Sequence, residues 1–307
     1  MSDRRLRRYA IGDRIGPRHT VLGVIDDKRG RHPVYMAWDH RDWCPMACKV
    51  FRSAAGAERE GAILSSVAHP NVVRLLHRDG AALFLEFLEG FSLSCFIDDR
   101  SRRLGLSDVL RVGMHVGAAL AHMHGQGVMH LDVNPSNIIV VHGRPVMIDL
   151  GTARRFDEAR PREVSGTDPY IAPEECLRGE VTPAADVFGL AVLVYELLTG
   201  ALPFGKGARA DPFPQTSRAP SPLRTHRPAA PKGLDDLLLS GLARDPRDRP
   251  PLPAFLLGLH GYIRAGRGMW PAGFTPEPGG RSAEAGSRTD RREADIARAV
   301  AGAATPR

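Results

Sequence analysis

The chain has 307 residues, of which 43% are hydrophobic and 25% are charged, the balance of a globular protein with an ordinary core. No apolar run reaches the roughly 18–20 residues that a membrane-spanning helix needs. The charged first residues are not followed by the apolar segment of a secretory signal, so we expect a cytoplasmic protein. The net charge of +7 is spread along the sequence without an aromatic-rich basic patch, which argues against nucleic acid as a partner.

The first hundred residues alternate short β-like runs with turns that are rich in Gly, Pro and Asp. One helix is predicted among them at residues 55–67, where apolar side chains recur at helical spacing. The strands are predicted, from runs of β-branched, aromatic and apolar residues, at 20–25, 34–38, 46–51, 72–76 and 82–87.

The period of the sequence becomes helical after Ser101. Ser107 is a candidate N-cap, and Gly125 is expected to end this helix. Its apolar stripe is Val109, Val112, Val116, Leu120 and Met123. Thr182-Pro183 is expected to begin a second helix, which is apolar nearly all round and therefore buried, and Gly200 is expected to end it.

The rest of the second half contains fewer regular elements. Residues 205–232, rich in Pro and Arg, predict a long surface connection, and a last helix is predicted at 234–242. The four cysteines follow no metal-ligand spacing, so reduced structural thiols are expected.

The switch from strands to helices predicts an α+β protein of two lobes. The N-lobe is expected at about 19–90 and the C-lobe at about 91–262, with an extension at 1–18 before them. Residues 263–307 are expected to be a disordered basic tail, because Gly, Pro, Ser and charged residues cannot bury enough surface to fold.

Polar groups suited to phosphoryl transfer follow one another along the chain. This chemistry needs positioned cations, a cradle for phosphates and a group that orients the attacking hydroxyl. Lys49 lies in a predicted strand, and Glu60 lies in the next helix at a distance suited to pairing. Asp132 is followed five residues later by Asn137, and Asp149 opens an Asp-Leu-Gly turn. Further along come Gly166-Thr167, Ala172-Pro173-Glu174, Asp186 and Arg249.

In this order and spacing, these residues make the chain resemble the eukaryotic-like protein kinases, most closely the bacterial Ser/Thr branch, from about residue 19 to 262. The resemblance implies the kinase fold, with a small β-rich N-lobe that contains one main helix and a larger, mostly helical C-lobe. It also implies that the γ-phosphate of ATP is transferred to Ser or Thr of a protein substrate with Mg²⁺ or Mn²⁺.

The resemblance assigns a role to each matching residue. Lys49, held by Glu60, would grip the α- and β-phosphates. Asp132 would orient the substrate hydroxyl or accept its proton. Asn137 and Asp149 would hold the metal ion, since hard oxygen donors suit Mg²⁺. The adenine and hinge contacts would come from Ile25, Val34, Ala47, Leu85, Glu86, Leu88 and Ile139.

Other matching residues would support the C-lobe. Thr167 would contact Asp132, and its presence indicates Ser/Thr specificity. Glu174 would form a buried ion pair with Arg249, and Asp186 would accept backbone N–H groups of the catalytic loop.

Three departures from the family pattern bear on activity. The glycines that usually cradle phosphate fall on Asp27, Arg29 and His32, so weak ATP affinity is expected. Asn134 takes the catalytic place of a lysine, and its amide can donate a hydrogen bond but brings no cation. Leu131 replaces the arginine that binds a phosphorylated activation loop, so activity is expected not to depend on that phosphorylation.

Two alternatives stay open at the level of sequence. A pseudokinase, which binds nucleotide or partners as a scaffold, would fit the altered glycine loop, although the catalytic and metal-binding positions are intact. A small-molecule phosphotransferase of the aminoglycoside type shares the Asp–Asn–Asp arrangement but lacks a segment like Gly166–Glu174. Any activating signal is expected to arrive through a partner protein or the tail.

Overall fold

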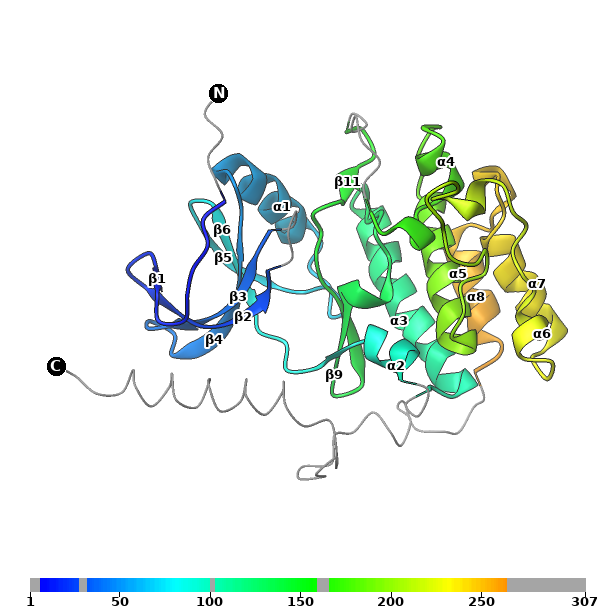
Figure 1. The fold of residues 1–307 in the computed structure, drawn as a ribbon, viewed down its shortest axis with the longest axis horizontal. Coiled ribbons are helices and arrows are strands. Elements are labelled where there is room, and N and C mark those ends of the chain that lie inside the picture. Colours follow the sequence, from blue (N-terminus) through cyan, green and yellow to red (C-terminus); the bar gives the residue numbers. More distant parts are fainter. Residues whose placement is uncertain (1–5, 28–31, 100–102, 159–165, 264–307) are drawn as a thin grey trace. The chain divides into compact units, whose positions relative to one another are not determined.

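The computed structural model describes residues 6–27, 32–99, 103–158 and 166–263 (Figure 1). The described residues form two compact units. The first contains the chain up to Ser65 together with Val73–Glu89, and the second contains Ser66–Val72 and the chain from Gly90 onward. The expected tail at 263–307 lies outside the described residues, apart from Ile263.

The first unit is built on a six-stranded antiparallel sheet in the order β1-β2-β3-β4-β6-β5. Its strands are β1 (Arg14–Ile15), β2 (His19–Asp26), β3 (Val34–Asp39), β4 (Cys44–Val50), β5 (Leu75–Asp79) and β6 (Ala82–Glu86). The Tyr9 N–H donates to the Tyr35 hydroxyl at 3.1 Å. Residues before His19 are therefore part of this sheet unit.

Different groups pack against the two faces of the sheet. One face forms an apolar core that includes Tyr35, Cys48 and Phe84, three residues that oppose one another across neighbouring strands. The other face is covered by the helix α1 (Ala54–Ser66), because a Cβ at Gly61 would lie 3.1 Å from Leu83. Alternation along the strands places Lys49 on this second face.

The second unit is mostly helical. Its helices are α2 (Ser94–Asp98), α3 (Leu106–Gly125), α4 (Pro173–Cys176), α5 (Ala184–Thr199), α6 (Leu223–His226), α7 (Lys232–Gly241) and α8 (Leu252–His260). Every residue of α5 from Ala185 to Thr199 is buried, so α5 is the central helix of the unit. A Cβ at Gly113 would lie only 2.9 Å from Val194 and 3.3 Å from Leu259, so this glycine lets α3 pack closely against α5 and α8.

Short strands and single 3₁₀ turns complete the second unit. β7 (Phe91–Ser92), β9 (Ile138–Val141) and β10 (Arg144–Met147) form one small sheet, and β8 (Val128–Met129) pairs with β11 (Arg154–Arg155). The 3₁₀ turns are η2 (Pro135–Asn137), η3 (Asp168–Tyr170), η4 (Pro214–Thr216) and η5 (Pro246–Asp248). Within the described ranges, no helix has both the length and the apolar character needed to cross a bilayer.

Most of the predicted elements are confirmed with small shifts of their ends, including the buried stripe of α3 and the left-handed Gly200 (φ 70°) that ends α5. The strand predicted at 72–76 is present with both ends shifted, as β5 (Leu75–Asp79). Val72 forms only an isolated bridge to Met147, and β5 begins at Leu75. The Asn71 side chain donates to Pro145 O at 2.6 Å, which holds this segment in the second unit.

One helix begins earlier than predicted, and another helix was not predicted. Ser107 lies inside α3, whose N-cap is Gly105, because the Gly105 carbonyl already accepts the N–H groups of Asp108 and Val109. The helix α8 was not predicted, although the prolines before it are a start signal.

Candidate active site

Lys49 and Glu60 form a buried ion pair in the first unit. Lys49 Nζ donates to the two carboxylate oxygens of Glu60 at 2.7 and 2.8 Å, and the residues are 6% and 2% exposed. The strand β4 supplies the lysine and α1 supplies the glutamate. Because both side chains are buried, each charge neutralises the other, and removal of either one would leave an unpaired buried charge that destabilises the fold.

The residues expected around adenine come from several elements. Val34 pairs with Lys49, and Ala47 pairs with Leu85, so these side chains share the face of the sheet that carries Lys49. Ile25, near the end of β2, is 41% exposed. In the expected hinge, the Glu86 carboxylate accepts the Arg74 N–H at 2.9 Å, and Leu88 is half-buried. Ile139, half-buried on β9, belongs to the second unit.

The structure describes part of the segment in which the sequence alignment places the phosphate-cradling glycines of the family. Asp27 is exposed and forms an ion pair with Arg8. The His32 ring lies 4.5 Å from the Phe51 ring, and Lys49 Nζ lies 5.4 Å from the centre of that same ring. Arg29 lies outside the described residues.

Asp132 is held by three hydrogen-bond donors in the second unit. Its Oδ1 accepts from Asn134 Nδ2 at 2.8 Å and from the Thr167 N–H at 3.0 Å. Its Oδ2 accepts from Asn137 Nδ2 at 2.7 Å. Thr167 thus contacts Asp132 through its backbone, while its hydroxyl accepts a hydrogen bond from Asn134 at 3.0 Å. The carboxylate is therefore fixed in one orientation, and the residue is only half-buried.

Asn134 is embedded in the loop and does not project from it. It is 1% exposed, and its Oδ1 accepts from the N–H groups of Ser136 and Asn137, which caps the 3₁₀ turn η2. The sequence predicted the donor ability of this amide but not its capping role. The signal was present in Asn134-Pro135, an N-cap residue followed by proline at N1.

Asn137 and Asp149 lie on neighbouring segments, since the Ile148 N–H donates to Asn137 O at 2.8 Å. Asp149 adopts a left-handed conformation (φ 61°), and its Oδ1 accepts the Gly151 N–H at 3.1 Å. The Asn137 amide nitrogen donates to Asp132, so the amide oxygen is the atom of this side chain that could bind a metal ion. An amide oxygen and a carboxylate are hard donors that fit Mg²⁺ or Mn²⁺.

Asp186 anchors the loop that carries Asp132. Its oxygens accept the N–H groups of His130 and Leu131 at 2.9 and 2.8 Å, and His124 Nε2 lies 2.8 Å from Oδ2. Burial on its own would raise the pKa of Asp186, but the hydrogen bond and charge of His124 and the Leu131 N–H hold it below its ordinary value. The part played by His124 was not predicted, although a histidine in the last turn of a helix is a recognisable signal.

The lowered pKa of Asp186 predicts a pH-dependent contribution to folding. Below the ordinary carboxyl pKa of about 3.9 the unfolded chain binds a proton that the native chain does not, so the contribution is present above this pH and is lost as the pH falls toward the folded pKa. The free energy of unfolding of Asp186→Asn should lie below that of the unchanged protein at pH 6, and this gap should narrow between pH 5 and 3. Urea unfolding measures the gap. A gap independent of pH, as expected for the exposed control Asp236→Asn, would contradict the prediction.

The other residues that the family resemblance singled out also lie in the second unit. Glu174 on α4 receives two hydrogen bonds of 2.7 Å from Arg249, and both residues are buried. Leu131 has a positive φ of 63° and is 8% exposed. A Cβ at Gly166 would lie 3.2 Å from Leu131 O, so the backbone of Gly166 lies directly against this residue.

Comparison with known proteins identifies the class. Residues 32–257 match the family model of the protein kinase domain. The chain therefore belongs to the protein kinase family, as the order of its polar residues predicted. Its fold is similar to the crystal structure of a mutant of the Mycobacterium tuberculosis PknI kinase domain, with a TM-score of 0.65 over 83% of this chain and 99% of that chain at 24% identity. The predicted α+β kinase fold is confirmed.

Curated relatives narrow the class to bacterial serine/threonine-protein kinases. The chain is 30% identical to PknA of M. tuberculosis over 272 residues, covering 81% of this chain and 62% of PknA. It is 28% identical to PrkC of Bacillus subtilis over 256 residues, covering 78% of this chain and 39% of PrkC. These matches lend no support to the pseudokinase or to the small-molecule phosphotransferase.

Proposed function

We propose that this chain transfers the γ-phosphate of ATP to Ser or Thr hydroxyl groups of a protein substrate, with Mg²⁺ or Mn²⁺. The observation that carries the proposal is the Asp132 carboxylate, which three donors hold at 2.7–3.0 Å in a loop that Asp186 anchors. A scaffold has no use for a carboxylate fixed in this way, and family membership supplies the class of reaction.

In the proposed reaction, Asp132 orients the substrate hydroxyl and takes its proton. The hydroxyl oxygen forms a bond to the γ-phosphorus, the bond between that phosphorus and the β–γ bridging oxygen breaks, and ADP leaves. Lys49, fixed by Glu60, holds the α- and β-phosphates. Asn137 and Asp149 would hold the metal ion, which would supply positive charge against the phosphates.

Asn134 acts in this proposal as a positioning residue for Asp132. Its amide nitrogen donates to the Asp132 carboxylate at 2.8 Å, and its oxygen caps the turn that carries Asn137. Since it brings no cation to the transferred phosphate, we expect a slow kinase. The replaced glycines, with an acidic side chain at Asp27, lead us to expect weak ATP affinity as well.

The test is incubation of the purified chain with labelled ATP and Mg²⁺ or Mn²⁺, alone and with generic Ser/Thr substrates, followed by mapping of phosphorylated residues. Metal-dependent transfer to Ser or Thr supports the proposal. Nucleotide binding without any transfer under these conditions would establish the pseudokinase in its place. The substrate protein, a regulatory partner and the cytoplasmic location remain predictions from the sequence.

Replacing Asn134 tests its positioning role. Asn134→Ala should lower kcat by about one to two orders of magnitude, because a hydrogen bond to a charged group is worth about 1.5–3 kcal/mol. The KM for ATP should change little. Asn134→Asp keeps the capping oxygen but places a second carboxylate beside Asp132, so it should not restore kcat.

The control for this substitution is Asp236→Asn, an exposed change on α7 that makes no hydrogen bond with the loop of Asn134. Its steady-state kinetics should resemble those of the unchanged chain. If Asn134→Asp had normal kcat, the residue would serve only as a helix cap, and the positioning role would be excluded.

A further inference from the structure

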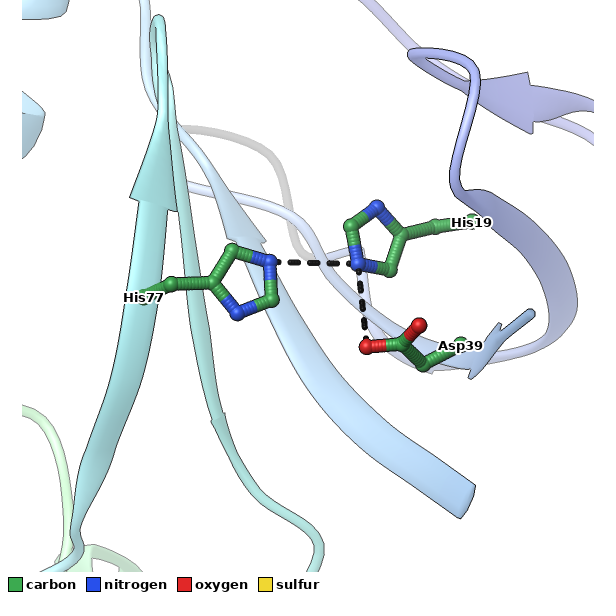
Figure 2. A group of neighbouring side chains, drawn as sticks. All are labelled: His19, Asp39 and His77. Atoms are coloured by element: carbon green, nitrogen blue, oxygen red, sulfur yellow. Dashed lines mark hydrogen bonds and ion pairs between the residues drawn. The ribbon is translucent and has the colours of Figure 1, made fainter. Parts of the chain in front are cut away.

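His19, Asp39 and His77 meet in the first unit, and none of the three is assigned to catalysis (Figure 2). His19 is the first residue of β2 and Asp39 the last of β3, and the two oppose each other in the register of the strands. His77 lies on β5. His77 Nε2 is 3.1 Å from His19 Nε2, which is 3.6 Å from Asp39 Oδ2. All three potential ligand atoms lie within 4.8 Å of one another.

These residues come from opposite ends of the sheet. In the order β1-β2-β3-β4-β6-β5, two strands separate β3 from β5. The His19 and His77 rings both stack on Phe84 of β6, at 3.7 and 4.5 Å. A Cβ at Gly16 would lie 2.9 Å from Asp79 Oδ2, so the ends of the sheet also approach beside the cluster. A group bound there would hold the curled sheet closed.

Lone pairs of His19 Nε2 and Asp39 Oδ2 face each other in the cluster, and His77 Nε2 can bind a metal ion in the tautomer that is protonated at Nδ1. His19 Nδ1 lies 3.3 Å from the Ile15 carbonyl, which can only accept, so the proton sits on Nδ1 and Nε2 carries a lone pair. Asp39 Oδ1 accepts from Arg18 Nε and from the N–H of Arg41, each at 2.7 Å. Asp39 Oδ2, in a residue that is 0% exposed, forms an ion pair with Arg18 Nη2 at 2.5 Å and keeps a second lone pair. It points toward His19 Nε2, where like partial charges repel.

A cation between these atoms would relieve the repulsion. Neutral imidazoles are the form that binds metal ions. Arg18 Nη2 lies 2.5 Å from Asp39 Oδ2 and keeps the carboxylate ionised and oriented, as groups behind a metal ligand commonly do.

We propose that His19, Asp39 and His77 bind a divalent transition-metal ion of the zinc class. Two imidazoles and one carboxylate are a common zinc ligand set that leaves a fourth position for water. Zinc bonds of about 2.05 Å in a tetrahedron separate ligand atoms by roughly 3.3–3.4 Å. The separations of 3.1 and 3.6 Å bracket this value, and the third ligand atom has less than 1.5 Å to move to reach it. The ion would be structural, tying β5 to β2 and β3.

Zinc titration of the full, nucleotide-free chain against a chelating indicator tests the proposal. The unchanged chain should bind one equivalent of Zn²⁺ tightly and unfold at a higher temperature with it. His77→Gln, which alters a half-buried ligand, should weaken this binding by about 100-fold or more, since even groups behind a ligand are worth 10–100-fold. His40→Gln is the matched control, because His40 lies in the same sheet unit and its side chain hydrogen-bonds Thr20, which is not one of the proposed ligands.

Two further measurements distinguish this zinc site from the proposed catalytic metal site. Asp149→Asn should keep the zinc binding, which shows that the ion does not occupy the proposed catalytic metal position. Co²⁺ should give the intense visible bands of tetrahedral coordination in the unchanged chain and not in His77→Gln. If His77→Gln bound Zn²⁺ as tightly as the unchanged chain, or if neither bound it, the cluster would be a hydrogen-bonded histidine pair and the metal site would be excluded.

Discussion

Asp132→Asn is expected to lower kcat by about 10²–10⁴-fold, the usual worth of a positioned general base. The substitution exchanges one carboxylate oxygen for an NH₂ group and keeps the size of the residue, so the loop that Asp186 anchors should stay in place. An amide cannot take the proton of the substrate hydroxyl. It would also turn a donor toward one of the amides of Asn134 and Asn137, which now donate to the carboxylate.

The kinetic signature distinguishes this effect from a loss of ATP. Because the proton is transferred only on the way to the transition state, the dissociation constant for nucleotide should change little while turnover falls. Steady-state phosphorylation and nucleotide titration with Mg²⁺ measure the two quantities. Asp236→Asn, an exposed change on α7, is the control. An equal loss of nucleotide affinity would mean that Asp132 binds metal or ATP and is not the base.

Much of the candidate site could be predicted from the sequence. The order of the polar residues along the chain matches that of the family, and this order indicates which residues are partners even when they are far apart in the sequence. Lys49 and Glu60 are in contact, and Asp186 accepts the loop N–H groups, as the resemblance implied. The buried pair of Glu174 and Arg249 is also present. In each case a charged residue at a fixed place in the order indicated its partner. What these residues do in catalysis remains a proposal.

What could not be predicted depends on tertiary packing. His19, Asp39 and His77 share no local spacing, and they meet only because strand register and the curl of the sheet bring β2, β3 and β5 together. Val72 looked like a strand residue because it is apolar, but a hydrogen bond from Asn71 holds its segment in the other unit. The sequence predicted that the Asn134 amide can donate a hydrogen bond but not that the side chain is buried. Pattern alone cannot supply contacts between distant segments.

Glu174→Ala is expected to lower the free energy of unfolding by about 3–5 kcal/mol, the usual cost of removing one partner from a buried ion pair. The Arg249 side chain is fully buried and the Glu174 side chain is 7% exposed. Two parallel hydrogen bonds of 2.7 Å join them, and Arg249 also donates to the carbonyls of Ala184 and Ala243. These carbonyls satisfy part of the guanidinium but do not neutralise its charge.

The same chain offers an exposed pair as the matched control. Arg247 donates to Asp245 from a side chain that is 87% exposed, so water can replace the contacts that are lost when it is removed. The free energy of unfolding of Arg247→Ala should therefore be close to that of the unchanged protein. Urea unfolding of both variants gives the comparison. A further arm replaces both buried charges, as in Glu174→Leu with Arg249→Met, and should recover part of the loss because no uncompensated charge remains. If Glu174→Ala were no less stable than Arg247→Ala, water would reach the Arg249 guanidinium, and the pair would not be the buried link between α4 and the segment after α7.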